Sequence, residues 1–252
     1  MPGAKPRPVS IGYTKAARIL RRHADPARSK VHRWYFKGAE DEIFLGLTVP
    51  ILRQLAREFE LLPHADVRRL MTSKVHDERL LGCAILQRRY ATGTDGEREK
   101  IFAFFVRNRR QVRSWDAVDG VAPNIVGPHL LKRDKKLLYQ WARSSSLWER
   151  RISMVATLHF IRHGNVADTL RLARILLHDE EDLIHKATGW MLREVGKRDP
   201  AALKKFLKAH AGTMPRTMLR YAVERFPERE RQRWLQEGKN GPVLLPAKPV
   251  AK

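Results

Sequence analysis

Cysteine, long apolar runs and acidic residues are all scarce in this 252-residue sequence, and each scarcity excludes a class of protein. The single cysteine, Cys83, rules out an intrachain disulfide and lies in the apolar stretch LLGCAIL, where we expect a small buried side chain. No run of 18 apolar residues is present to span a membrane, and the N-terminus lacks the apolar core of a signal peptide. We therefore expect a cytoplasmic protein that does not enter a membrane.

The shortage of acids leaves the chain strongly basic. It has 50 Lys and Arg residues against 27 Asp and Glu residues, which gives a net charge of +23. Such a charge requires a polyanionic partner, and nucleic acid is the first candidate, ahead of an anionic membrane surface. The 43% of apolar residues is ordinary for a globular protein, so the charge belongs to a folded chain and not to a disordered one.

Common cofactor motifs are also missing. The sequence contains no GxxxxGK[ST] phosphate loop, no GxGxxG after a strand and no GxSxG nucleophile turn. His159 and His163 are four residues apart, but the glutamate of a zinc-binding HExxH motif is absent. We therefore predict neither a metal ion nor a cofactor.

Apolar residues recur at three- and four-residue spacings in several segments, which is the pattern of amphipathic helices. Residues typical of helix termini agree with this pattern. Thr48 and Asp199 are typical of helix starts, and Gly164 and Gly196 are typical of helix ends. No convincing alternating strand pattern is found, so the predicted fold class is all-α. The clearest helical segments are residues 78–91, 97–110, 148–164 and 182–197.

The helices also recur along the chain. A basic residue precedes an apolar helical stretch at Arg79, Arg151, Lys186 and Arg216, at separations of 72, 35 and 30 residues. The first separation is twice 36, and Trp115 falls 36 residues after Arg79. A period of this length predicts an α-solenoid of HEAT-like helical repeats with a curved, concave basic surface. An irregular helical bundle with chance spacings is the alternative.

The two ends of the chain differ in composition from the middle. Residues 1–9 and 238–252 are rich in proline, glycine and lysine, as flexible basic tails are. We expect a single repeat domain between them, residues 10–237, in a monomeric protein.

The stretch RSWDAVDG, residues 113–120, places two acids in basic surroundings. Trp115 and Asp119 are four residues apart and would share one face of a helix, whereas Asp116 would point elsewhere. Asp119 is thus the carboxylate that could share a pocket with the indole. Core packing beside a solvated charge is the simpler explanation of this spacing, and the spacing alone does not separate the two.

A second tryptophan, Trp190, stands between Lys186 and Arg193. An indole flanked by cations suits stacking on a sugar or base while the cations bind phosphates, although such a tryptophan alone is more often a core residue. Arg151 could bind a phosphate or pair with an acid. Arg113 closes a run of arginines and is a further candidate for binding DNA.

Three aromatic residues, Trp34, Tyr35 and Phe36, follow one another in HRWYFKG. Three consecutive residues cover most of a helix's circumference, so at least one of them should lie in the core.

Four stretches together resemble the DNA alkylation repair family, the AlkD-type alkylpurine DNA glycosylases. The W-D-x-V-D motif of residues 115–119 and the K-A-x-G-W-x-L-R-E motif of residues 186–194 are quite specific in combination, and the resemblance covers roughly residues 10–230. The stretches are FLGLTVPILRQLAREFE (44–60), RSWDAVDGVAPNIVG (113–127), LWERRISMVATLHFIRHG (147–164) and IHKATGWMLREVGKRDP (184–200).

The resemblance implies a superhelix of HEAT-like repeats that binds double-stranded DNA on its concave basic face. It also implies hydrolysis of the N-glycosidic bond of cationic N3- or N7-alkylated purines. Asp119 would be the catalytic carboxylate, and Trp115 and Trp190 would pack against the deoxyribose of the lesion. Arg151 would bind a phosphate nearby, and Tyr35 best matches the family's N-terminal cleft tyrosine.

The implied chemistry explains an acid in a basic chain. Departure of an alkylated purine leaves positive charge on the sugar, and a fixed carboxylate stabilises that charge. We expect Asp119 to be ionised in such a positive field. The main alternative is a non-catalytic HEAT-repeat protein that binds nucleic acid, and a helical scaffold for acidic proteins is another. A carboxylate at Asp119 favours the enzyme, because a protein that only binds DNA gains nothing from it.

Overall fold

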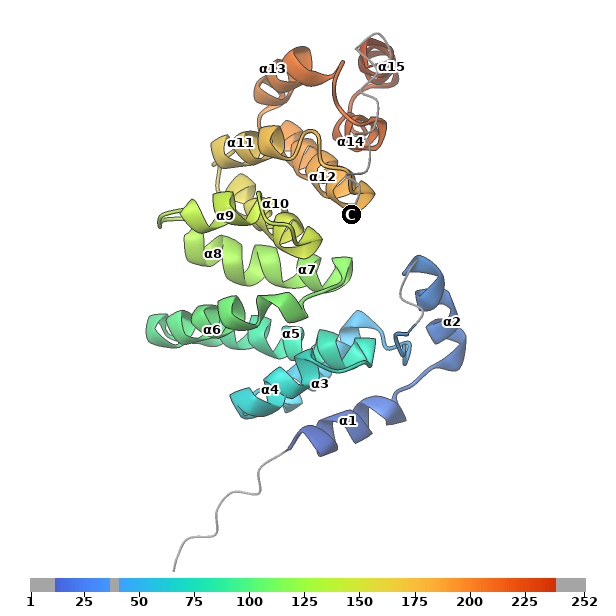
Figure 1. Ribbon diagram of the computed structural model, residues 1–252, viewed down its shortest axis with the longest axis vertical. Helices are drawn as coiled ribbons and strands as arrows, with labels where there is room; N and C mark the ends of the chain where they lie inside the picture. The colour runs from blue at the N-terminus through green and yellow to red at the C-terminus, as the bar shows by residue number, and fades with distance from the viewer. Residues whose placement is uncertain (1–11, 37–40, 239–252) are drawn as a thin grey trace, which may run out of the picture. The chain divides into compact units, whose positions relative to one another are not determined.

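The computed structural model describes residues 12–36 and 41–238, and most of these residues belong to helices (Figure 1). Within these two ranges the only β-type pairing is an isolated bridge between Ile43 and Val75, so the all-α prediction is confirmed. No helix in the described ranges is both long and apolar enough to cross a membrane. The predicted tails, 1–9 and 238–252, lie outside the described residues except for Gly238.

The helices are numbered in chain order, and η1 and η2 are a short 3₁₀ turn and a π-helical turn. They are α1 (Tyr13–Arg22), α2 (Pro26–Tyr35), α3 (Val49–Glu58), α4 (His64–Met71), α5 (His76–Thr92), α6 (Asp95–Asn108), η1 (Arg109–Gln111), α7 (Trp115–Val121), η2 (Ala122–Val126), α8 (Gly127–Leu130), α9 (Lys136–Trp141), α10 (Leu147–Arg162), α11 (Ala167–Ile175), α12 (Asp182–Arg198), α13 (Pro200–His210), α14 (Arg216–Ala222) and α15 (Glu228–Glu237).

Capping side chains fix where several helices begin. At the start of α6, Thr94 accepts the backbone N–H of Glu97, and the Glu97 carboxylate accepts the N–H of Thr94 in return. Asp199 caps α13 by accepting the N–H of Ala202 at 2.9 Å, as predicted for this helix start. The four clearest predicted segments correspond to α5, α6, α10 and α12, with boundaries within two residues.

The two glycines predicted at helix ends behave differently. Gly164 follows α10 with a φ of +79°, the left-handed conformation that ends many helices. Gly196 does not end α12, which continues to Arg198, so that prediction is wrong. The missing side chain of Gly196 instead leaves room for Leu203 of α13, which a Cβ at this position would meet.

The chain divides into two compact units, residues 1–113 and 114–252. A repeat array has no single core, because each helix pair packs mainly on its neighbours. A division into two units is therefore compatible with the single domain predicted for residues 10–237, which stays a prediction.

In the first unit, α5 is the central helix. It packs against α3, α4 and α6, and α1 lies against α4 and α5. Large side chains such as Phe59, Leu81 and Phe105 are fully buried in this unit.

Helix α2 is attached to the first unit by polar contacts, and none of its residues is buried. The N–H of its N-cap Asp25 donates to the Leu45 carbonyl at 2.8 Å, and Ser29 Oγ donates to the Phe44 carbonyl at 2.7 Å. The segment that receives α2 is itself fixed, because buried Asp77 accepts the N–H of Leu45 at 2.7 Å. Much of the surface of α2 is therefore exposed.

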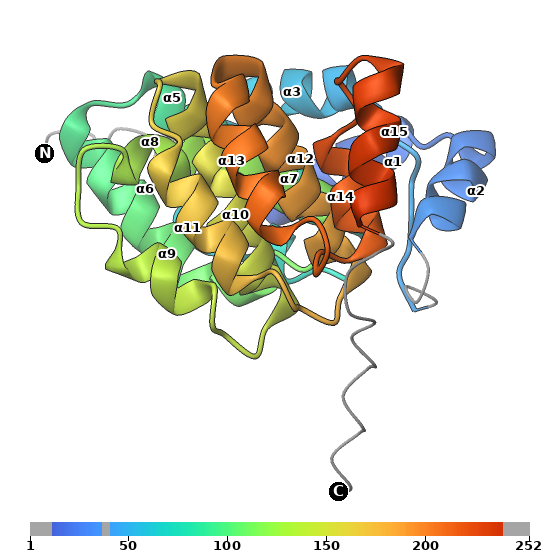
Figure 2. The ribbon, with the colours of Figure 1, turned by 90° about the horizontal axis from the view of Figure 1, so that it is seen from above.

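In the second unit, α10, α12 and α14 pack in succession, and α11 and α13 each contact α12. In Figure 1, α9, α11 and α13 lie on one side of this unit and α7, α12 and α14 on the other. Figure 2 shows α12 between α13 and α14. This successive packing is the solenoid-like arrangement predicted from the sequence period.

The approach of α12 to α14 depends on Gly189. A Cβ at this position would lie 2.5 Å from the Met218 carbonyl oxygen and 2.5 Å from the Tyr221 Cβ. Both neighbours belong to α14, and a backbone oxygen cannot rotate away as the end of a side chain can. The glycine therefore fixes how closely α14 lies beside Trp190.

Candidate active site

The WDAVD motif folds as the start of α7, and it separates the two acids. Trp115 is the first residue of the helix, and Asp119 follows one turn later on the same face; both are half-buried. The Asp116 carboxylate instead accepts the backbone N–H of Ala117 at 2.8 Å, in the first helical turn, where a negative charge complements the helix dipole. The two acids therefore have different surroundings.

Asp119 forms a two-point ion pair with Arg151 of α10. Arg151 Nε donates to Oδ1 at 3.0 Å, and Nη2 donates to Oδ2 at 2.9 Å. The remaining terminal nitrogen, Nη1, donates to the Leu183 carbonyl at the start of α12, at 2.5 Å. The Arg151 side chain is 5% exposed and the Asp119 side chain is 22% exposed. A buried guanidinium thus holds a carboxylate that remains in part accessible.

The pKa of the Asp119 carboxyl lies above its ordinary value, and burial is the largest cause. Arg151 opposes this increase through its charge and its hydrogen bonds, whereas the charge of Asp116 adds to it. Local burial and one arginine therefore dominate the pKa of Asp119, ahead of the net charge of the chain. Without Arg151, only burial and the charge of Asp116 would remain, and both raise the pKa of Asp119.

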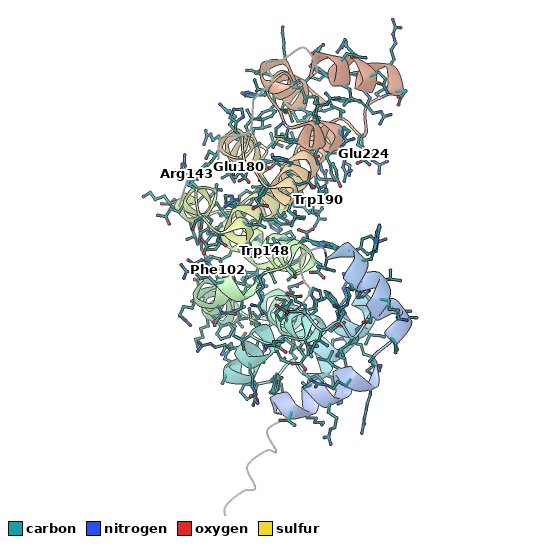
Figure 3. The ribbon with its side chains drawn as sticks, turned by 45° about the vertical axis from the view of Figure 1, so that its right-hand side comes forward. Phe102, Arg143, Trp148, Glu180, Trp190 and Glu224 are labelled. Carbon is teal, nitrogen blue, oxygen red and sulfur yellow. The ribbon has the colours of Figure 1, made fainter. Side chains whose placement is uncertain are left out.

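Trp190 lies on α12 between two cations that are both paired with acids. Lys186 Nζ lies 2.7 Å from the Asp182 carboxylate one turn earlier, and Arg193 pairs with Glu224 just beyond α14. Figure 3 shows Trp190 and Glu224 on the same side of this unit. The two pairs cancel the charges on either side of Trp190, which is itself half-buried.

In the first unit, Trp34 and Tyr35 end α2 and Phe36 follows it; none of the three is fully buried, so the prediction that one of them lies in the core is wrong. Trp34 is 70% exposed and Tyr35 is 60% exposed, and their rings meet edge to face at 4.9 Å. Phe36 packs on the rings of Phe44 and His76, at 5.2 and 4.6 Å. Phe36 is therefore the inward-facing member of the three.

The arginine run at the end of the first unit is well exposed. Arg107, Arg110 and Arg113 all lie at the surface, in and around η1. Within residues 12–36 and 41–238, no carboxylate pairs with any of these three side chains. They are therefore cations available to an anionic partner.

Comparison with known proteins shows which family the chain belongs to. A model of the DNA alkylation repair enzyme family matches residues 16–226, which is most of the chain. The chain belongs to the DNA alkylation repair enzyme family. A solved structure, a predicted DNA alkylation repair enzyme from Enterococcus faecalis, has a similar fold, with a TM-score of 0.64 and 17% identity over 82% of this chain and 98% of that chain. No curated protein matches the sequence.

Membership of the DNA alkylation repair enzyme family gives the chain a role, as an enzyme, in the repair of alkylated DNA. The matched range contains every predicted site residue. The structure brings Asp119 and Arg151 into contact and places Lys186, Trp190 and Arg193 along one helix. Tyr35 and Arg113 belong to the first unit. In the described ranges no group of three or more His, Cys, Asp or Glu residues is arranged to hold a metal ion.

The partners of the site's cations were not predicted from the sequence. The Leu183 carbonyl lies 32 residues after Arg151, which itself lies 32 residues after Asp119. Glu224 lies 31 residues after Arg193. Contacts one repeat apart could have suggested these partners, but the sequence period was too irregular to show which residues face each other.

Proposed function

We propose that this protein is a DNA glycosylase that hydrolyses the N-glycosidic bond of purines alkylated at N3 or N7 in duplex DNA. The observation that carries the proposal is the partly accessible Asp119 carboxylate, held at both oxygens by buried Arg151. A carboxylate fixed in this way is already oriented to stabilise positive charge that develops beside it. Membership of a family that repairs alkylated DNA supports the substrate class.

The proposed reaction follows from the charge of the lesion. Alkylation at N3 or N7 gives the purine a positive charge. When the C1′–N bond breaks, its electron pair goes to the base, which leaves as a neutral molecule, and the positive charge passes to the sugar. Water then adds to C1′ through its oxygen and loses a proton, which yields a free alkylpurine and an abasic deoxyribose.

In this scheme Asp119 stabilises the sugar cation and positions the attacking water. Arg151 occupies both carboxylate oxygens, which favours an electrostatic role for Asp119 over that of a general base. Arg151 is then a positioning residue, because it orients both carboxylate oxygens and opposes the effect of burial on the pKa of Asp119. A phosphate contact by Arg151, which the resemblance implies, is the alternative role.

We assign the two tryptophans to the deoxyribose of the lesion. Trp115 shares a helix face with Asp119, and an indole face attracts a developing cation. Trp190 lies between two ion pairs, and neutral surroundings of this kind suit a sugar or a base better than a phosphate. Lys186 and Arg193 would contact the DNA backbone only after releasing their acids.

Phosphate binding is assigned first to the exposed arginines that have no acid partner in the described part of the chain, among them Arg113. A second DNA contact is proposed on α2, where Tyr35 and the still more exposed Trp34 stand near the exposed cations Lys30 and Arg33. Exposed aromatic rings beside cations are a common arrangement for binding nucleic acid. We propose that the protein acts in the cytoplasm as a monomer on chromosomal DNA, without a metal or cofactor.

The test is single-turnover release of free base from a duplex that carries N7-methylguanine. Asp119→Asn should slow release by about 10²–10³-fold, the usual effect of removing one preorganised electrostatic group. Asp116→Asn removes the same charge three residues away and should stay close to wild type, because Asp116 does not share the helix face of Trp115 and Asp119.

Stability must be measured beside activity. Asn at position 119 leaves buried Arg151 without its counter-charge, at a cost of about 1–3 kcal/mol, so release should be assayed well below the melting temperature. Equal rates for the Asp119 and Asp116 variants would contradict the assignment. Duplex binding without base release by the wild type would favour the alternative, a non-catalytic nucleic-acid-binding protein.

A further inference from the structure

The strip of α12 around Trp190 holds cations whose charges are cancelled by acids. Glu224, beyond the end of α14, pairs with Arg193, and Asp182 pairs with Lys186. Glu194 also lies 3.8 Å from Arg193 Nε, but it is closer to Lys197, at 2.6 Å. Acids at these positions oppose DNA binding, so charge complementarity alone does not account for them in a chain of net charge +23. We infer that Glu224 is a specificity-determining residue, which withholds Arg193 from DNA phosphates until a lesion is bound. The inference rests on the proposed glycosylase function and adds a residue that this function does not require.

The packing of the second unit keeps Glu224 close to Arg193. Gly189 lets α14 lie directly against α12, one turn before Arg193, and Glu224 follows α14 after two residues. The Arg193 side chain is 18% exposed and the Glu224 side chain is 47% exposed. The pair therefore lies at the surface, where a phosphate can compete for the guanidinium.

Competition between a carboxylate and a phosphate changes the energetics of the contact. An unpaired arginine that binds a phosphate displaces counterions from DNA, and this release makes the contact favourable at low salt. Arg193 must first leave Glu224, and the freed carboxylate then stands beside the negatively charged backbone. The exchange brings little net gain, so it occurs only where other contacts already hold the DNA at Trp190.

Undamaged and alkylated DNA should respond differently to this exchange. An undamaged duplex is held by the exposed arginines around η1, and Arg193 stays with Glu224. An alkylated duplex, held by the contacts of its lesion sugar with the two tryptophans and Asp119, draws a phosphate close enough to displace the carboxylate. Glu224 thus weakens binding to undamaged DNA more than binding to the lesion, which is how a repulsive element creates specificity.

The test is a salt titration of duplex affinity with Glu224→Gln. For undamaged duplex, the slope of log K against log salt should steepen by about 0.9, the value for one additional phosphate contact. The affinity ratio between a duplex with 2′-fluoro-N7-methylguanine, which resists hydrolysis, and an undamaged duplex should fall by roughly three- to tenfold, because a contact of this kind is gained mainly by the undamaged complex.

Two further variants separate a specific effect from a change in net charge. Glu228→Gln removes the same charge on α15 and also releases an arginine, Arg231, from an ion pair. It should leave the slope unchanged. The double variant Arg193→Gln with Glu224→Gln should restore the wild-type slope, since Arg193 is the cation that Glu224 withholds.

An unchanged slope for Glu224→Gln, or an equal change for Glu228→Gln, would overturn the inference while leaving the glycosylase proposal in place. A double variant that keeps the steeper slope would overturn it as well. If Glu224→Gln steepens the slope but the wild-type protein releases no base, the glycosylase proposal is contradicted. The inference that Glu224 withholds Arg193 from phosphates is then still supported.

Discussion

Asp119 and Arg151 form the closest link between the chemistry and the structure at the scale of single residues. Burial raises the pKa of Asp119, and the two-point contact with Arg151 counteracts that increase. In the proposed reaction only the ionised carboxylate would stabilise the sugar cation, so activity should fall as the pH drops through this pKa. Arg151 is therefore expected to extend activity toward acidic pH.

Replacing Arg151 tests this coupling. In Arg151→Gln the influences that remain on Asp119 both raise its pKa, so the acidic limb of the pH–rate profile should move to higher pH. The loss of activity relative to wild type should be larger in mildly acidic buffer than in mildly alkaline buffer. Single-turnover base release across a pH series measures the shift.

The neighbouring arginine of the same helix supplies a matched control. Arg150 also forms a close ion pair, with Asp179 at 2.6 Å, but does not contact Asp119. Arg150→Gln should therefore lower stability without moving the acidic limb. If the two variants have the same pH profile, or the limb of Arg151→Gln moves to lower pH, then Arg151 does not set the pKa of Asp119.

At the scale of helices, the approach of α14 to α12 positions Trp190 and the ion pair beyond it. Gly189→Ala would place a Cβ 2.5 Å from the Met218 carbonyl, which is backbone and cannot yield. Forcing the two helices apart should cost about 1–3 kcal/mol, or several degrees in melting temperature. Base release should also slow, because Trp190 is displaced with its helix.

Gly196→Ala, seven residues later in the same helix, is the control. Its Cβ would meet the end of the Leu203 side chain, which can rotate, and alanine is the better helix former at both positions. Thermal melts should show the smaller loss of stability for Gly196→Ala. An equal or smaller loss for Gly189→Ala would mean that the spacing of α12 and α14 does not depend on Gly189.

The sequence predicts helices well and their mutual contacts poorly. The apolar periodicity of α10 and α12 is local, so it is visible without a structure. The role of Gly196 is not local, because it depends on Leu203 of the next helix, and the sequence reading misplaced it as a helix end. The aromatic trio shows the same limit, since its composition required one inward residue but did not identify Phe36.

In the candidate site, too, local features could be predicted from the sequence and contacts between helices could not. The WDAVD spacing predicted that Trp115 and Asp119 share a face, because this depends only on helix geometry. The acids paired with Lys186 and Arg193 were not predicted as their partners. Asp182 is only one turn away, but Glu224 comes from another helix pair, and no pattern in the sequence shows which repeats meet there.

At the scale of the whole molecule, the basic side chains behind the net charge of +23 are of two kinds. Some are paired with acids, as Arg193 is, and others are exposed without such partners in the described ranges, as Arg113 is. Arg113→Gln should flatten the salt dependence of binding to undamaged duplex by about 0.9 in slope, whereas Arg193→Gln should leave it unchanged. The reverse pattern in a fluorescence anisotropy titration would show that pairing does not determine which cations bind phosphate.

The proposed reaction depends on the charge of the lesion, because the residues assigned to the site include no evident acid for protonating a leaving base. Asp119 is paired with Arg151, and neither tryptophan motif contains a histidine. The leaving base must therefore bring its own positive charge.

Release of free base from matched duplexes that carry N3-methyladenine, N7-methylguanine, hypoxanthine or uracil tests this most directly. We predict Asp119-dependent release of the two cationic purines and no release of the two neutral bases. Efficient, Asp119-dependent release of hypoxanthine, or no release of either methylated purine, would contradict it.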